Sequence, residues 1–255
     1  MDLKERHNIE ELQRHPWEIS RVKVVKKLLG KNLINGAHIL DIGCGDLFLE
    51  ECFLAENKSL HFYCVDTAYS PEEVEELNQK YTNVSVYNSL HDFEKEEVKI
   101  DLLLLMDVVE HIEDDKGFLE HLKAQAYITP DTRILVTVPA FQSLFSSHDH
   151  FLGHYRRYNA ARMKKLVNES GLSIHKYGYF YFMLLLPRAI QLLKERMSGV
   201  KEETTGLVEW KGSAFVTKGL VNVLVADYKI GNFFNKLGIR FPGLSLYVLC
   251  QKKRV

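Results

Sequence analysis

The chain has 255 residues, 46% of them hydrophobic and 26% charged, which is typical of a globular protein and excludes a disordered one. Its formal net charge of −1 provides no overall basic field, so we expect no nucleic-acid partner. The charged residues 1–16 lack the apolar core of a secretion signal, and no apolar run reaches the ~20 residues that a membrane span requires.

Short apolar stretches alternate with helical patterns along most of the chain. Because the apolar stretches have no polar side, they fit the strands of a parallel sheet covered by helices, and we predict them at 37–43, 60–66, 84–88, 100–106 and 132–138. Helices are predicted near 47–57, 71–80 and 113–126, and over 160–169 after Asn159 as N-cap. Strand and helix in this order predict a single α/β domain over 1–255, with a Rossmann-like, doubly wound, seven-stranded sheet and helices on both faces.

Beyond Gly171 the alternation weakens. Residues 172–182 and 243–251 predict the last two strands, and residues 183–242 between them are interpreted as a helical insertion. The insertion has apolar positions at helical spacing, at Phe215, Leu220, Val221, Leu224, Tyr228 and Phe233. Such a pattern favours a core or homodimer face, and peripheral contact with a lipid surface is the remaining alternative.

Four cysteines are scattered along the chain without a C-x-x-C pair, at Cys44, Cys52, Cys64 and Cys250. Most of them fall in stretches that predict buried strands or helices. We therefore expect reduced, structural thiols in a cytoplasmic protein.

The first predicted strand leads into DIGCG at residues 41–45. Gly43 and Gly45 allow a sharp turn and a close approach of the backbone to a ligand at the carboxyl edge of the sheet. A dinucleotide site would need a third glycine where this chain has Phe48, so a nicotinamide-dependent oxidoreductase is disfavoured. Asp66 ends the second predicted strand, where a carboxylate can accept both hydroxyls of an adenosine ribose.

Three segments, ILDIGCGDLFLE (39–50), VD (65–66) and LLLLMDVVEHI (102–112), together resemble the class I S-adenosylmethionine-dependent methyltransferases. Within them the chain is similar to the small-molecule branch that has a D-V-x-E-H-I motif after the fourth strand. The resemblance covers roughly residues 15–180 and the last strand. It implies S-adenosyl-L-methionine as cofactor and methyl transfer to an O or N nucleophile of a small or carrier-linked acceptor, for example a glycan, a lipid or a natural product.

The same resemblance implies a set of cofactor contacts. The glycine turn would lie at the methionine end, the end of the second strand at the ribose, the third at the adenine, and the fourth would close the site. HPWEISR (15–21) resembles an N-terminal helical lid, taken as residues 1–35, although Trp17 and Arg21 could equally belong to a surface helix. The implied cofactor-binding residues are Arg21, Asp41, Gly43, Cys44, Gly45, Asp66, Thr67, Asn88, Ser89, Leu90, Met106, Asp107, Val108 and His111.

The segment after the fifth predicted strand, SSHDHFLGHYRRY (146–158), is dense in hydrogen-bonding side chains and resembles a segment of one group of bacterial methyltransferases. At this edge a second substrate would approach, so we predict His148 or His154 as proton acceptor, with Asp149 orienting the imidazole. Arg156 or Arg157 would hold an anionic group of the acceptor. The alternative is a salt-bridged brace, which would hold the loop onto the following helix through Asp149, Arg156, Arg157 and Tyr158.

Two further alternatives remain for this chemistry. Asp107, Glu110, His111 and His148 could hold a divalent ion, as a similar E-x-x-E-H arrangement does in some quinone and RNA methyltransferases, giving a metal-dependent O-methyltransferase. Because Glu110 falls near a helix start and Asp replaces the leading Glu, we expect no metal. A catalytically silent regulatory or scaffold protein that binds S-adenosylmethionine is disfavoured, because such a protein would not need the polar side chains of 146–158.

Overall fold

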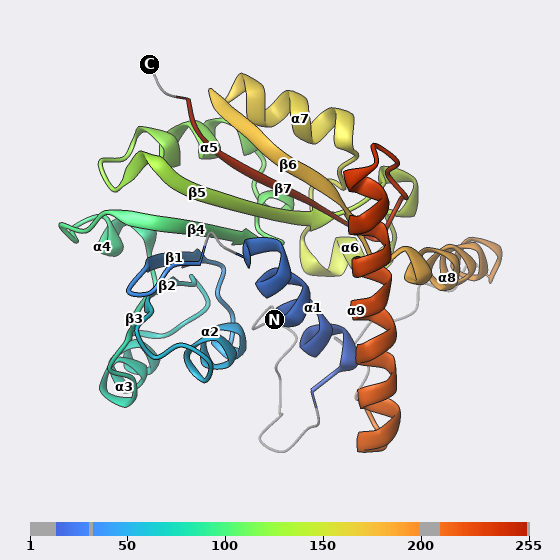
Figure 1. The fold of residues 1–255 in the computed structure, drawn as a ribbon, viewed down its shortest axis with the longest axis horizontal. Coiled ribbons are helices and arrows are strands. Elements are labelled where there is room, and N and C mark those ends of the chain that lie inside the picture. The colour runs from blue at the N-terminus through green and yellow to red at the C-terminus, as the bar shows by residue number, and fades with distance from the viewer. Residues whose placement is uncertain (1–13, 31–32, 199–209, 254–255) are drawn as a thin grey trace.

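The computed structural model describes residues 14–30, 33–198 and 210–253. A seven-stranded sheet with the order β3-β2-β1-β4-β5-β7-β6 forms its centre (Figure 1). The strands are β1 (His38–Ile42), β2 (His61–Val65), β3 (Val84–Tyr87), β4 (Ile100–Met106), β5 (Ile128–Pro139), β6 (Leu172–Phe180) and β7 (Ser245–Lys252). Strands β1 to β5 pair in parallel, whereas β7 lies antiparallel between β5 and β6. The predicted seven-stranded α/β fold is confirmed, with a mixed sheet.

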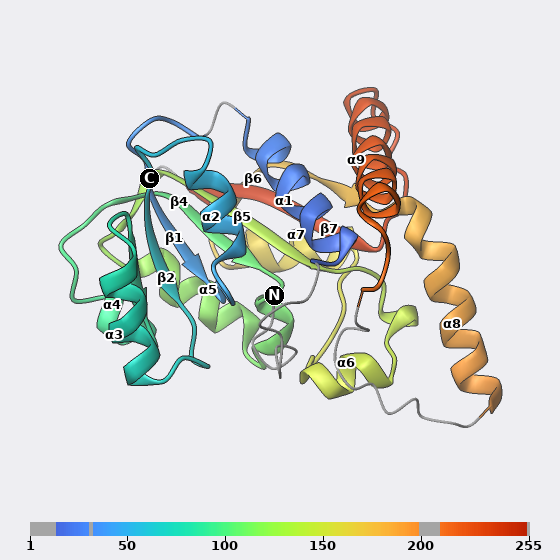
Figure 2. The ribbon, with the colours of Figure 1, turned by 90° about the horizontal axis from the view of Figure 1, so that it is seen from below.

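Helices cover both faces of the sheet (Figure 2). One face is covered by α1 (Pro16–Leu29), α2 (Phe48–Leu54), α3 (Pro71–Lys80) and α9 (Ala214–Lys236). The other is covered by α4 (Leu90–Phe93), α5 (Asp115–Ala124) and α7 (Ala160–Glu169). Two more helices, α6 (Ser147–Leu152) and α8 (Leu185–Ser198), lie away from the centre of the sheet.

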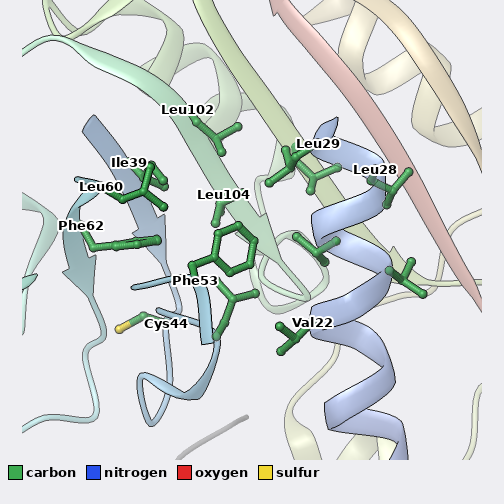
Figure 3. Packing of buried hydrophobic residues seen from close by; sticks show 14 of the residues in the cluster. Val22, Leu28, Leu29, Ile39, Cys44, Phe53, Leu60, Phe62, Leu102 and Leu104 are labelled. Carbon is green, nitrogen blue, oxygen red and sulfur yellow. The ribbon is translucent and has the colours of Figure 1, made fainter. Parts of the chain in front are cut away.

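The continuous apolar run of β4 serves two cores at once. Successive side chains of a strand point to opposite faces, so Leu102 and Leu104 enter one core while Leu103 and Leu105 enter the other. Figure 3 shows Leu102 and Leu104 directed toward Phe53 of α2 and the apolar side of α1. This two-sided burial explains why the strand carries no polar alternation.

Helix α1 is part of the core and not a loose cover. His15 caps its start and Pro16 occupies its first turn, which favours a helix beginning there. Its apolar side packs between the sheet and α9 (Figure 1). The Ser20 and Tyr181 hydroxyls, 2.7 Å apart, connect it to the segment that follows β6. A helix thus lies within 1–35, of which residues 1–13 and 31–32 lie outside the described residues, and its role as a lid stays a prediction.

The segment 183–242 contains α8 and α9, and residues 199–209 between them lie outside the described residues. Its predicted apolar positions fall into two groups. Val221, Leu224 and Tyr228 are buried, whereas Phe215, Leu220 and Phe233 are exposed. Only one side of α9 therefore serves the core.

Candidate active site

The glycine turn lies between the ends of β2 and β4. Gly43 donates its backbone N–H to the Val65 carbonyl at 2.7 Å, and both Gly43 and Gly45 have positive φ, at 74° and 64°. A Cβ at Gly43 would lie 2.7 Å from Cγ2 of Val108, so a larger residue would push the ends of β1 and β4 apart. Glycine is required here for conformation and for space.

Asp66 is fixed against this turn. Its carboxylate accepts the backbone N–H of Gly45 at 3.0 Å and that of Ala68 at 3.0 Å. The hydroxyl of Tyr69 donates to the Gly45 carbonyl on the same side. The ends of β1, β2, β3 and β4 thus bring most of the expected cofactor residues to one edge of the sheet, namely Asp41, Gly43, Cys44, Gly45, Asp66, Thr67, Asn88, Ser89, Leu90, Met106, Asp107 and Val108.

Two acidic side chains are buried just below the glycine turn. Neither Asp41 nor Glu50 reaches solvent, and among the described residues both Asp41 oxygens and Oε2 of Glu50 lack a hydrogen-bond partner. Burial, and the nearby Glu50, raise the pKa of Asp41 well above its usual range, and burial raises the pKa of Glu50. The pair therefore holds its protons to a higher pH than exposed acids do.

Arg21 reaches the same edge from α1, where its guanidinium is already bound. Nη2 lies 2.9 Å from Oδ2 of Asp107 and donates to the Thr137 hydroxyl at 3.2 Å. Thr137 in turn donates to Oδ1 of Asp107, which has a φ of 57° directly after β4. A residue other than glycine in the left-handed region is strained unless its surroundings hold it, and here the ion pair and the hydrogen bond do so. The expected contact of Arg21 with the cofactor carboxylate stays a prediction.

A second arginine of the N-terminal segment was missed by the sequence analysis. Arg14 forms an ion pair with Asp46, and its guanidinium lies 4.3 Å from the centre of the Phe48 ring. It thereby contacts two of the three residues that directly follow Gly45. The sequence offers only a basic residue ahead of Pro16, which is too common a feature to indicate this contact.

Asp149 is the centre of the segment 146–158, which follows β5. It lies in α6 with no exposed surface and accepts hydrogen bonds from Arg157, through Nε at 2.7 Å and Nη2 at 3.0 Å, and from the Ser146 backbone N–H at 3.0 Å. Nδ1 of His154 lies 2.9 Å from Oδ1. Burial would raise the pKa of Asp149, but the hydrogen bonds of His154 and Arg157 outweigh it and hold the pKa well below its usual range. Asp149 is therefore ionised.

His154 faces two residues of the D-V-x-E-H-I motif. Its ring and that of His111 meet edge to face, with centroids 4.6 Å apart. Glu110 beside them is fully buried, and neither carboxyl oxygen has a hydrogen-bond partner in the part of the chain that the structure describes. Burial and nearby Asp107 raise the pKa of Glu110 well above its usual range. One ligand atom from each of Glu110, His111 and His154 lies within 4.8 Å of the others.

This group differs from the four metal ligands considered from the sequence. Asp107 is paired with Arg21, and His148 does not belong to the group, in which His154 is the second histidine. His148 is half-buried in α6, where burial and Arg188 lower its pKa. Arg188, which the sequence analysis also missed, approaches Asp149 to 3.6 Å from α8. No local signal predicts it, because the two helices are far apart in sequence.

The remaining residues of the segment hold it against α5. Arg156 pairs with Asp115 at 2.9 Å and donates to the Glu113 carbonyl at 2.8 Å. The hydroxyl of Tyr158, which is fully buried, also donates to Asp115 at 2.8 Å. A brace therefore exists, but these contacts hold the segment to α5 and not to the following helix, as the expected brace would; the role of Arg156 in binding the acceptor stays a prediction.

Comparison with known proteins identifies the family. Residues 10–177, more than half of the chain, match the family model described as "Methyltransferase domain". No curated protein matches the chain.

Solved structures share the fold at low identity. Coclaurine N-methyltransferase bound to N-methylheliamine and SAH is 14% identical with a TM-score of 0.58, over 96% of this chain and 73% of the other. The [4+2]-cyclase SpnF is 13% identical with a TM-score of 0.55, over 98% and 86%. Phosphoethanolamine N-methyltransferase 2 of Haemonchus contortus, in complex with S-adenosyl-L-methionine, is 18% identical with a TM-score of 0.53, over 93% and 53%. With its family match and this fold, the chain belongs to the methyltransferase domain family and is a class I S-adenosylmethionine-dependent methyltransferase.

Proposed function

We propose that this methyltransferase methylates an oxygen or nitrogen of a small or carrier-linked acceptor, and that His154, oriented by Asp149, removes the proton of that nucleophile. The observation that carries the proposal is the contact between His154 Nδ1 and a fully buried, ionised Asp149. The carboxylate favours the proton on Nδ1, so Nε2 keeps the lone pair that a base requires. The shared fold does not by itself support this chemistry, because one structural neighbour is a cyclase.

The residues at the first four strand ends fit S-adenosylmethionine. The glycine turn brings backbone close to the ligand site, and Asp66 offers a fixed carboxylate beside it for the ribose hydroxyls. Buried Asp41 lies at the methionine end, where its unpartnered oxygens can accept hydrogen bonds. When bound, S-adenosylmethionine supplies an electrophilic methyl group on a positively charged sulfur.

The protein's own contribution is orientation and a place for one proton. Arg157 and Asp149 fix the position of His154, and the aromatic contact with His111 fixes its ring plane. A base held in this way loses little conformational freedom when the acceptor binds. His148, on the same helix as Asp149, is the other histidine proposed for this step.

Two variants separate the two halves of the site. His154→Ala should lower turnover by about 10²–10⁴-fold and leave S-adenosylmethionine affinity unchanged, because a general base contributes to the chemical step alone. Asp66→Ala should weaken that affinity by about 1–3 kcal/mol, the cost of leaving polar groups unpaired. His150→Ala, an exposed histidine of α6, is the matched control.

The measurements are calorimetry with S-adenosylmethionine and transfer of a labelled methyl group to a panel of glycans, lipids and aromatic acids. If His154→Ala unfolds, or loses cofactor affinity in step with turnover, the segment is structural and the proposed base is wrong. Tight binding of NAD would contradict the cofactor assignment.

A metal-assisted reaction is the second candidate, favoured by the grouping of Glu110, His111 and His154. A carboxylate and two imidazoles can hold a divalent ion that orients a hydroxyl acceptor. Asp149 would then orient the ligand His154 through its contact with Nδ1. We expect turnover to survive chelation. Loss of turnover that one of Mg²⁺, Mn²⁺ or Zn²⁺ restores would favour the metal-assisted reaction, with Glu110→Gln abolishing the rescue.

A further inference from the structure

Helix α8 projects from the body of the protein (Figures 1 and 2). Among residues 185–197, whose side chains the structure describes, only Leu192 is buried. Large apolar side chains nevertheless recur along it at a spacing of three and four residues, which places them on one side of a helix. We call these residues the α8 stripe: Met183, Leu186, Ile190, Leu193 and Met197, with exposed fractions from 46% to 79%.

The apolar surface continues from the start of α8 to the end of α9. Phe182 lies next to Phe241, with ring centroids 6.0 Å apart, and Phe241 contacts Phe234 of α9 at 5.0 Å. Phe233 and Leu237 nearby are also more than half exposed. Isolated exposed apolar residues are common, but a continuous set of this kind usually marks a contact surface.

Polar contacts attach α8 to the segment 146–158 and to the residues just before it. Arg188 donates to the Ser146 hydroxyl at 2.5 Å, and Arg196 donates to the Ser143 carbonyl at 3.3 Å. Glu195 accepts the Ser147 backbone N–H at 3.0 Å. These contacts hold α8 beside α6, which carries Asp149.

The charge of the region is basic although the chain as a whole is not. Residues 182–243 carry nine basic and five acidic side chains, whereas the net charge of the chain is −1. In the described part of this region the acids are Glu195 and Asp227, and both accept backbone N–H groups of the protein. Exposed basic side chains lie along both helices and after α9, at Lys194, Lys218, Lys229, Lys236 and Arg240. An apolar stripe beside such a charge complements an anionic lipid surface.

We propose that the α8 stripe docks on an anionic lipid bilayer, with its apolar side chains below the headgroups and the neighbouring lysines among them. No helix in 14–30, 33–198 or 210–253 has both the length and the apolar character needed to cross a bilayer. The proposed contact is interfacial and reversible. Because α8 is attached to α6, docking brings the Asp149–His154 pair close to the lipid, and, resting on the proposed function, we infer that the acceptor is an amphiphile held in that membrane.

The test is co-sedimentation of the full chain with vesicles of phosphatidylcholine, alone or with roughly one third phosphatidylglycerol. We expect binding to the anionic vesicles and little binding to the neutral ones. Leu186→Ser/Leu193→Ser should bind about tenfold or more weakly, because two apolar side chains leave the interface. Lys194→Glu should bind about fivefold or more weakly.

Matched controls change the same residue types elsewhere. Ile34→Ser removes an apolar side chain that is 54% exposed before β1, and Lys116→Glu reverses a charge on α5. Both should bind like the parent protein. All substituted positions are on the surface, and if the double variant nevertheless unfolds, Lys194→Glu still provides the comparison.

Three results would overturn the proposal. The parent could fail to bind anionic vesicles, or the double variant could bind them as the parent does. Light scattering could instead show a dimer that the double variant abolishes, which would assign the stripe to a second copy of the chain. His154→Ala should still bind vesicles, so loss of docking and loss of the proposed chemistry are distinguishable.

Discussion

The fully buried carboxylate of Asp149 forms hydrogen bonds with His154, with Arg157 and with the backbone N–H of Ser146. Arg157 is itself almost fully buried, so its charge depends on this one carboxylate for compensation within the described residues. Removing one partner of such a pair leaves a buried charge uncompensated, which is far more costly than the net value of the pair. The same residue thus stabilises the segment and orients His154.

Glu50 provides a test of the buried acids. Burial raises the pKa of Glu50 and that of Asp41. The protonated pair therefore contributes its full stability to the fold below the pKa that these acids have in the unfolded chain. This contribution is lost as the pH rises through their pKa in the folded protein. Glu50→Gln keeps the shape without the ionisable group. We expect its melting temperature to exceed that of the parent by about 2–4 °C at neutral pH, the shift that about 1 kcal/mol produces in a chain of this size.

Melting curves of Glu50→Gln and the parent between about pH 5 and about pH 9 check the direction of the pKa shift. The difference in melting temperature in favour of the variant should grow as the pH rises. Glu56→Gln, an exposed acid just after α2, is the control and should show no such trend. An advantage that shrinks with rising pH would contradict the raised pKa of the pair.

At the scale of elements, the segment between β5 and α7 has two sides, which correspond to the brace and to the proposed base. The side of the segment that includes Arg156 and Tyr158 binds α5, and the side that includes Asp149 and His154 faces the motif after β4. The two sides coexist because Asp149 lies in α6 and Arg156 lies after it, so that their side chains bind different neighbours. The observed brace is therefore compatible with the proposed base on the other side of the segment.

Arg156→Ala tests the bracing side. It removes an ion pair and a hydrogen bond to α5, and we expect it to lower the free energy of unfolding by about 1–3 kcal/mol while turnover per folded molecule stays unchanged. Denaturant unfolding and methyl transfer measure the two quantities. Lys165→Ala removes an exposed ion pair with Glu169 on α7 and should change neither the free energy of unfolding nor turnover. Normal stability with lost turnover would instead favour the acceptor-binding role predicted for Arg156.

At the scale of the whole molecule, the first and the last helix of the described residues stabilise one another. Helix α9 covers α1, and α1 delivers Arg21 to the edge where the glycine turn lies. The insertion before the last strand is therefore coupled to the expected cofactor site through a shared core. Figure 3 shows the α1 side of that core, where Val22 and Leu29 point toward α2 and the sheet.

Leu224→Ala tests this coupling. The side chain is 7% exposed in the core that α9 shares with α1, so its removal should cost about 2–5 kcal/mol of unfolding free energy. Leu220→Ala, one turn earlier and 41% exposed, should cost less than about 1 kcal/mol. Equal losses for the two variants, measured by denaturant unfolding, would show that α9 contributes nothing specific to the core.

Several parts of the protein could be predicted from the sequence because they depend on near neighbours in the chain. Apolar runs and capping residues determine the order of strands and helices, and Asn159 caps α7 as expected. The glycine turn and Asp66 belong to one strand–helix–strand unit, in which geometry follows from local connections. The family resemblance rested on these same segments.

Only the tertiary structure decided which distant residues meet. It places Asp107 against Arg21, groups His154 with Glu110 and His111, and brings Arg188 to Asp149. It also buries one side of α9 while leaving the α8 stripe exposed, although both helices have similar apolar patterns. The physical reason is that periodicity specifies which side of a helix is apolar, whereas the packing of the whole chain determines what, if anything, covers that side.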